Sequence, residues 1–136
     1  MDWKLESVIV PVADQDRAKS FYVETLGWDL IVDHRAGEDF RVIQVSPPGS
    51  ACAVALMRNP DAGGSVQGLH LVVADIEAAR AELVQRGVDA SEFFHFDEGA
   101  QVAGMDPARG DYNTFLTFQD PEGTGWMVQE VGRAPR

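Results

Sequence analysis

The sequence predicts an α+β protein in which two tandem strand–helix–three-strand (βαβββ) repeats form a curved mixed sheet around a central cavity, with the helices outside. The first observation is an internal repeat, because residues 12–14 and Ala18 recur as residues 73–75 and Ala79. The second is hydrophobic periodicity, which alternates in the strand segments and forms helical stripes between them. One such unit cannot bury both faces of its sheet, so two units together are expected to enclose the cavity.

The first repeat spans residues 5–58 and begins with a strand at residues 7–12. Asp14 follows as a helix N-cap, since its carboxylate can accept hydrogen bonds from unpaired backbone N–H groups. The helix presents an apolar stripe that includes Phe21 and Tyr22, and it ends at Gly27, where a left-handed residue is typical. Three strands are expected after it, at residues 29–32, 40–45 and 51–57.

The second repeat spans residues 68–133 in the same order, with Asp75 as the N-cap of its helix. Glycine and proline predict a linker at residues 59–67 and a long loop at residues 97–111. The whole chain, residues 1–136, is expected to be one domain. The strands of this repeat are expected at residues 68–73, 90–96, 114–118 and 125–131.

The charge and composition restrict the partners. The formal net charge is −11 and the sequence pI is about 4.5, so nucleic acid and anionic membrane surfaces are expected to repel the chain. Neither a secretion signal nor a membrane-spanning segment is apparent, so a cytoplasmic protein is expected. The single cysteine, Cys52, excludes an intrachain disulfide and is predicted to be a buried, inert thiol.

Three stretches together carry a family resemblance: VIVPVADQDRAKSFYVETLGW, HLVVADIEAARAELVQRGV and FLTFQDPEGTGWMVQEV. They resemble the vicinal-oxygen-chelate superfamily of glyoxalases, bleomycin-resistance proteins and extradiol dioxygenases. The resemblance covers nearly the whole chain and implies the βαβββ fold. It does not fix one activity, because this fold hosts lyases, isomerases, dioxygenases, thiol transferases and drug-sequestering proteins.

The resemblance also locates the positions at which superfamily enzymes hold a divalent metal, one on each of four strands. In this chain the side chains at those four positions offer at most a hydroxyl or a thioether, whereas divalent ions favour imidazole and carboxylate ligands. No metal cofactor is therefore expected. One alternative stays open: His70 and Gln129 lie one step along the same strand faces and could hold a weakly bound divalent ion. The resemblance places the four positions at Ser7, Ala53, Gly68 and Met127.

Alternation along the strands selects residues that face the predicted cavity. His70 is the candidate catalytic base, and Gln129 offers both a donor and an acceptor to a ligand. His95 lies among phenylalanines and could stack on a planar ligand. For each residue the alternative is packing within the core. The candidates for ligand binding are Ser7, Gln44, His70, His95, Phe115, Met127 and Gln129.

These observations favour a small-molecule-binding protein with an apolar or aromatic pocket and without the usual metal. It would act by sequestration or by metal-independent acid/base chemistry. The first alternative is a metal-dependent glyoxalase- or dioxygenase-type lyase or isomerase. The second is a non-catalytic regulatory or interaction module. Relatives often form homodimers, and the apolar Trp3 together with the edge strands favours the same here.

Overall fold

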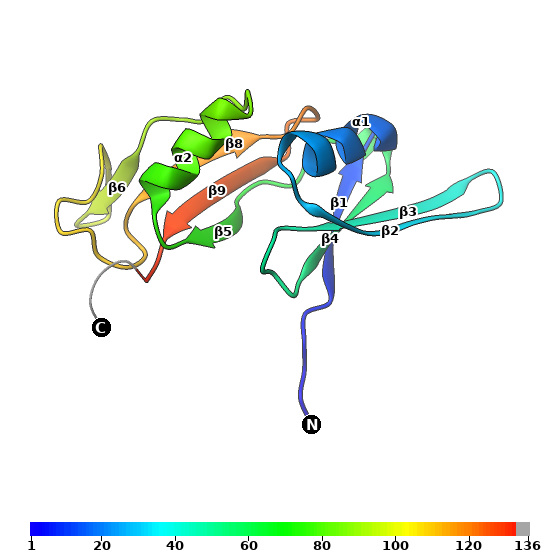
Figure 1. Ribbon diagram of the computed structural model, residues 1–136, viewed down its shortest axis with the longest axis horizontal. Helices are drawn as coiled ribbons and strands as arrows, with labels where there is room; N and C mark the ends of the chain where they lie inside the picture. The colour runs from blue at the N-terminus through cyan, green and yellow to red at the C-terminus, as the bar shows by residue number, and fades with distance from the viewer. Residues whose placement is uncertain (133–136) are drawn as a thin grey trace. The chain divides into compact units, whose positions relative to one another are not determined.

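The computed structural model describes residues 1–132 and confirms the α+β class with two β-sheets (Figure 1). The chain divides into two compact units. Of the described residues, the first unit comprises residues 1–66 with residues 120–124, and the second comprises residues 67–119 with residues 125–132. No helix within residues 1–132 is long and apolar enough to cross a membrane.

The first unit contains a four-stranded sheet in the order β1-β4-β3-β2. Strands β1 and β4 are parallel, and the other pairs are antiparallel. Alternation along β1 gives the sheet two faces, because Val10 and Val12 are fully buried while Ile9, the residue before Val10, is 65% exposed. The first strand after the helix continues to Ala36, beyond the predicted end at Val32, because it pairs with β3 along its whole length. The strands are β1 (Ser7–Val12), β2 (Asp29–Ala36), β3 (Phe40–Ser46) and β4 (Ala53–Arg58).

The helix of the first unit changes pitch. An α-helical turn, α1 (Gln15–Lys19), begins where the Asp14 carboxylate accepts a hydrogen bond from the backbone N–H of Arg17 at 3.0 Å, as predicted. It continues as a π-helical segment, Ser20–Thr25, whereas the sequence predicted one regular helix through both segments. Tyr22 in this segment is fully buried, and its hydroxyl donates to the Asp120 carboxylate at 2.7 Å. This bond attaches the Asp120–Thr124 turn to the first unit.

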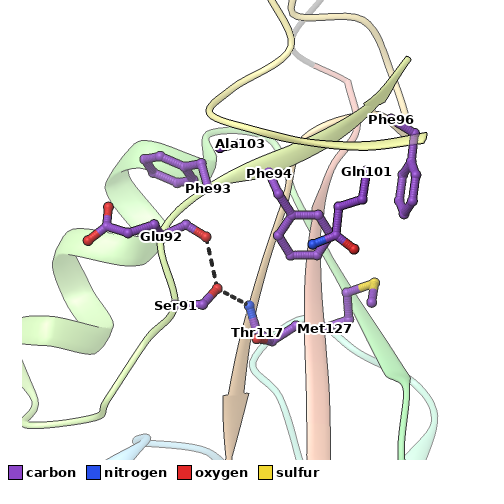
Figure 2. Close-up of a pocket in the computed structure, with 9 residues that line it drawn as sticks. All are labelled: Ser91, Glu92, Phe93, Phe94, Phe96, Gln101, Ala103, Thr117 and Met127. Carbon is purple, nitrogen blue, oxygen red and sulfur yellow. Dashed lines mark hydrogen bonds between the residues drawn. The ribbon is translucent and has the colours of Figure 1, made fainter. Parts of the chain in front are cut away.

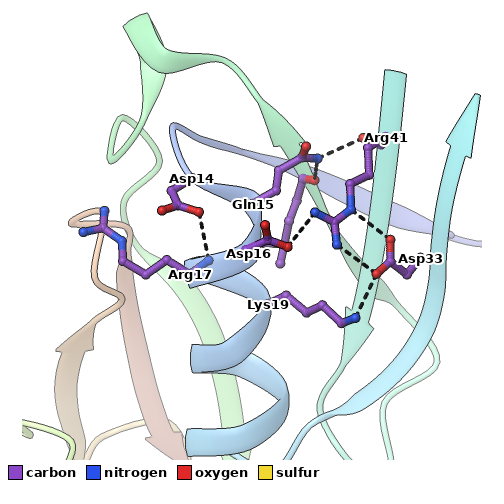
Figure 3. A network of polar contacts seen from close by, with 8 residues as sticks. Asp14, Gln15, Asp16, Arg17, Lys19, Asp33 and Arg41 are labelled. Carbon is purple, nitrogen blue, oxygen red and sulfur yellow. Dashed lines mark hydrogen bonds and ion pairs between the residues drawn. The ribbon is translucent and has the colours of Figure 1, made fainter. Parts of the chain in front are cut away.

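An ionic network joins the helix to the β2–β3 hairpin (Figure 3). The guanidinium of Arg41 donates from Nε and Nη2 to the two oxygens of Asp33, both at 3.0 Å. Its Nη1 donates to Asp16 at 2.7 Å, and Lys19 donates to Asp33 at 2.8 Å. Hydrogen bonds from Arg41 and then Lys19 hold the pKa of Asp33 well below its ordinary value.

The second unit contains a five-stranded sheet in the order β5-β9-β8-β6-β7. Its helix, α2 (Ile76–Gln85), is capped by Asp75, whose carboxylate accepts from the backbone N–H of Ala78 at 3.2 Å. The linker between the repeats contains one short 3₁₀ turn, Pro60–Ala62. The strands are β5 (Leu69–Val73), β6 (Phe94–Asp97), β7 (Ala100–Ala103), β8 (Phe115–Gln119) and β9 (Gly125–Glu130).

Two predictions for this unit are wrong. The strand expected at residues 90–96 starts only at Phe94, and the expected loop at residues 97–111 contains β7. The reason is a tight hairpin between β6 and β7. Its two central residues, Glu98 and Gly99, have φ values of 50° and 81°, which is the backbone that a two-residue hairpin needs.

A buried carboxylate organises the helix-facing side of this sheet. Glu130 is fully buried at the end of β9, and its Oε2 accepts a hydrogen bond from the backbone N–H of Ile76 at 3.0 Å. Arg109 donates from Nε and Nη2 to the two oxygens of Glu130, at 2.9 and 2.8 Å. The loop before β8 is thereby fastened to the strand and to the start of α2. We call the opposite face of the sheet, which carries no helix of this unit among the described residues, the open face.

Candidate ligand-binding site

The open face of the second sheet brings together residues from its central strands. Met127 lies between His70 on one neighbouring strand and Thr117 on the other, and Gln129 pairs with Phe115. Phe115 in turn pairs with Phe94 of β6. Because paired residues point to the same face, these side chains form one continuous surface.

Three phenylalanines, Phe94, Phe96 and Phe115, form an aromatic cluster on this face, and Figure 2 shows the first two of them. The rings of Phe94 and Phe115 are stacked, with centroids 5.4 Å apart and planes inclined by 18°. Phe96 meets both rings edge to face, with its centroid 5.5 Å from that of Phe115 and 6.1 Å from that of Phe94. Such contacts are favourable in themselves, so the cluster forms a preorganised apolar wall.

Beside this wall lies a cavity of about 500 Å³, which we call the aromatic cavity. Its size falls within the range of pockets for small molecules, about 300–1,000 Å³. Its lining combines aromatic rings and a thioether with a few polar groups. The lining residues that the argument uses are Ser91, Phe94, Phe96, Gln101, Thr117 and Met127.

The polar groups of this cavity differ in their availability. The Ser91 hydroxyl is already engaged, since it accepts from the backbone N–H of Thr117 and donates to the carbonyl of Glu92, both at 2.9 Å. The Gln101 amide and the Thr117 hydroxyl, in contrast, have no hydrogen-bond partner within residues 1–132. A ligand in the cavity would therefore find an apolar wall and two available polar groups.

Asn113 fixes the position of the aromatic wall. Its Oδ1 accepts from the backbone N–H of Phe96 and its Nδ2 donates to the carbonyl of Phe96, both at 3.0 Å. The side chain therefore gives Phe96 the same two bonds that a neighbouring strand would supply. The sequence did not predict this positioning role of Asn113, because its partner, Phe96, lies 17 residues away in the chain.

The candidate catalytic residue, His70, lies exposed on β5. Its Nδ1 is 2.7 Å from the carbonyl oxygen of Gly68, so Nδ1 must carry the proton of this hydrogen bond. In the neutral imidazole, Nε2 is then the nitrogen that can accept a proton. Gln129 lies two strand positions beyond Met127, and its amide donates to the carbonyl of Tyr112 at 3.3 Å. The structure thus brings His70, Phe115, Met127 and Gln129 onto one face, as predicted.

The remaining predicted site residues do not belong to this face of the second sheet. His95 is on the opposite face of β6 from Phe94 and Phe96, is buried, and has its Nδ1 2.7 Å from the carbonyl oxygen of Gly104. Ser7 and Gln44 belong to the sheet of the first unit, where they pair with residues of β4.

The side chains present do not fit a divalent metal site. Within residues 1–132, no group of three or more His, Cys, Asp or Glu side chains could hold a metal ion. Of the positions that the resemblance assigns to metal ligands, the second unit has Gly68 and Met127, flanked by one imidazole and one amide. A thioether and an amide are poor ligands for hard or borderline divalent ions, so no chemical step is derived through a metal.

Comparison with known proteins gives concordant matches. Residues 4–128 match the profile of the Glyoxalase/Bleomycin resistance protein/Dioxygenase superfamily. TnmS3, an antibiotic binding protein from Streptomyces sp. CB03234, has a similar crystal structure, with a TM-score of 0.73 and 29% identity over 96% of this chain and 98% of that chain. A glyoxalase/bleomycin resistance protein from the same organism has a TM-score of 0.68 and 31% identity over 93% of this chain and 100% of that chain. A protein of Shewanella frigidimarina (strain NCIMB 400) is 30% identical, covering 96% of each chain.

Proposed function

The chain belongs to the glyoxalase/bleomycin resistance protein/dioxygenase superfamily, and we propose that it binds a small planar molecule in the aromatic cavity without a divalent metal. The observation that carries this proposal is the preorganised cluster of Phe94, Phe96 and Phe115 beside a cavity of about 500 Å³. A planar apolar ligand can stack on such a wall and lose little flexibility when it binds. Sequestration of the ligand requires no further chemistry.

The relatives support ligand binding as the type of function. TnmS3 is an antibiotic binding protein, and this chain matches it over nearly the full length of both chains. Because the net charge of the chain is −11, a neutral or cationic ligand would meet less electrostatic repulsion than an anionic ligand. Glu92 at the cavity contributes to this charge, and its only ion pair within the described residues is an exposed contact with Arg80 at 3.2 Å.

A fluorescence titration with prodan, a neutral planar naphthalene fluorophore, tests the proposal. We expect saturable binding and a blue-shifted emission, with Kd raised about tenfold in Phe94→Ala because a stacking contact is lost. Phe40→Ala removes a half-exposed phenylalanine from the first unit and serves as the matched control. Equal Kd values for the wild type and Phe94→Ala would contradict the proposed site.

Acid/base chemistry at the same face is a second candidate, favoured by the hydrogen bond that leaves Nε2 of His70 available as a base. Gln129 would help to orient the substrate. Deuterium incorporation next to the carbonyl of small ketones and aldehydes, followed by NMR in D2O, measures this activity. We expect His70→Gln to abolish the exchange while prodan still binds, and exchange at an unchanged rate in this variant would refute the role of His70.

We further propose that the protein is a homodimer. Trp3, Leu5 and Ile9 are 89%, 70% and 65% exposed and are spaced two and four residues apart along the N-terminal arm and the edge strand β1 that follows it. A second copy of the chain would cover this apolar row. Light scattering coupled to size exclusion is expected to give a dimer, and Trp3→Ser/Leu5→Ser a monomer, with Lys4→Ser as the control. A monomeric wild type at about 50 µM, far above the Kd of a stable dimer, would contradict this.

A further inference from the structure

A second, smaller cavity of about 250 Å³ lies at one end of the same sheet face. It shares Thr117 and Met127 with the aromatic cavity, so the two spaces adjoin across these side chains. Its other walls come from the end of β8, the start of β9 and the segment before β5. The residues that the argument uses are Gln67, Gly68, Thr117, Gln119, Gly125 and Met127.

Part of the wall of this cavity is formed by two glycines, Gly68 and Gly125, which carry no side chain. Gly125 pairs with Gln119, and a Cβ at Gly125 would collide with Oε1 of Gln67, which lies directly over it. Gly68 beside it faces open space and has a φ of 75°, a left-handed conformation that favours glycine. A side chain at position 125 would therefore displace the Gln67 amide from its place over the glycine.

The polar chemistry of this cavity is that of uncharged amides. Gln67 and Gln119 each carry an amide that can donate and accept, and the Gln119 amide has no hydrogen-bond partner within residues 1–132. No Asp, Glu, Lys, Arg or His lines the cavity among the described residues. A charged ligand group would lose water here without gaining an opposite charge, whereas an amide or carbonyl group would find matching partners.

We propose that this cavity is a second binding subsite, which holds a neutral amide or carbonyl end of a ligand whose planar part occupies the aromatic cavity. The inference rests on the proposed function and specifies its ligand class: a planar apolar group with a short, uncharged, hydrogen-bonding tail. Thr117 and Met127 lie where the two parts of such a ligand would join.

Two compounds that differ only in the tail test the proposal. N-(2-naphthoyl)glycinamide carries the planar group and a primary amide, and N-isobutyl-2-naphthamide replaces that amide with an isopropyl group of the same shape. We expect wild-type protein to bind the glycinamide compound about threefold to tenfold more tightly, the range for one net hydrogen bond. Isothermal titration calorimetry measures both Kd values.

Two variants assign this preference to the cavity. Gln119→Leu keeps the size of the side chain but removes its amide, and we expect the two compounds to bind it with equal affinity. Gly125→Ala pushes the Gln67 side chain out of position, and we expect weaker binding of the glycinamide compound alone. Gln85→Leu, on the exposed side of α2, is the control and keeps the wild-type preference.

The outcomes separate the two proposals. If both compounds bind wild-type protein equally, or if Gln119→Leu retains the preference, the second subsite is overturned while the aromatic cavity stands. If neither compound binds at its solubility limit while both variants are folded, the proposed function and the second subsite fail together.

Discussion

The ion pair between Arg109 and Glu130 is expected to contribute strongly to the stability of the second unit. Arg109→Met removes the two hydrogen bonds that the guanidinium donates to a fully buried carboxylate, whose Oε2 also accepts from the Ile76 N–H. Breaking one partner of a buried pair costs about 3–5 kcal/mol, and the partial exposure of Arg109 places the expected loss near the lower value, about 3 kcal/mol. Methionine keeps a non-glycine residue at the left-handed backbone of position 109, so the strain there is unchanged.

Urea unfolding of three variants measures this loss. Arg86→Met removes an exposed pair with Glu82 on α2 and is expected to lower the free energy of unfolding by less than about 1 kcal/mol. In Arg109→Met/Glu130→Gln the buried charge is absent, and we expect the double variant to be more stable than Arg109→Met alone. If Arg109→Met loses no more stability than Arg86→Met, the buried pair does not fasten the loop as we argue.

Two further predictions concern the site and the first unit. Asn113→Ala removes both hydrogen bonds that its side chain makes with the Phe96 backbone. We expect the Kd for prodan, measured by fluorescence titration, to rise at least about threefold while the urea unfolding midpoint changes little. An unchanged Kd would show that Asn113 does not position the aromatic wall. Arg41 and Lys19 lower the folded-state pKa of Asp33, so this carboxylate stabilises the fold above its unfolded pKa of about 3.9, and the gain is lost as the pH falls toward the lower folded value. Urea midpoints between pH 6 and pH 2.5 should therefore fall less steeply in Asp33→Asn than in wild type, and parallel curves would show that Asp33 has no part in the acid sensitivity.

The local patterns of the sequence predicted the repeated elements well. Both N-caps are confirmed, because Asp14 and Asp75 each accept a hydrogen bond from the backbone N–H three residues later. A cap is a short-range interaction, so its residues stand close together in the sequence. Alternation likewise predicted that His70, Phe115 and Met127 face one side of the second sheet, since the period of a strand depends on the backbone alone.

Long-range pairs could not be predicted in this way. The bond between Arg109 and Glu130 spans 21 residues, and the contact of Asn113 with Phe96 spans 17, so no local pattern shows them. The β6–β7 hairpin was not predicted for another reason, because the glycines of residues 97–111 favoured the prediction of one long loop. The two-residue turn at Glu98 and Gly99 was the available signal, since Gly99 supplies the positive φ that such turns require.

The comparison of the two repeats separates what the fold needs from what the site needs. Both repeats keep the Asp cap and the alanine of the helix, which are elements of the helix-facing side. The faces opposite the helices differ. By strand order β3 corresponds to β8, and β3 presents Val42 and Gln44 where β8 presents Phe115 and Thr117. Large aromatic rings form walls that can enclose a ligand. The aromatic cavity therefore arises from side chains that the repeat pattern leaves free to vary, and this difference is the reason why we place the proposed binding site on the second sheet.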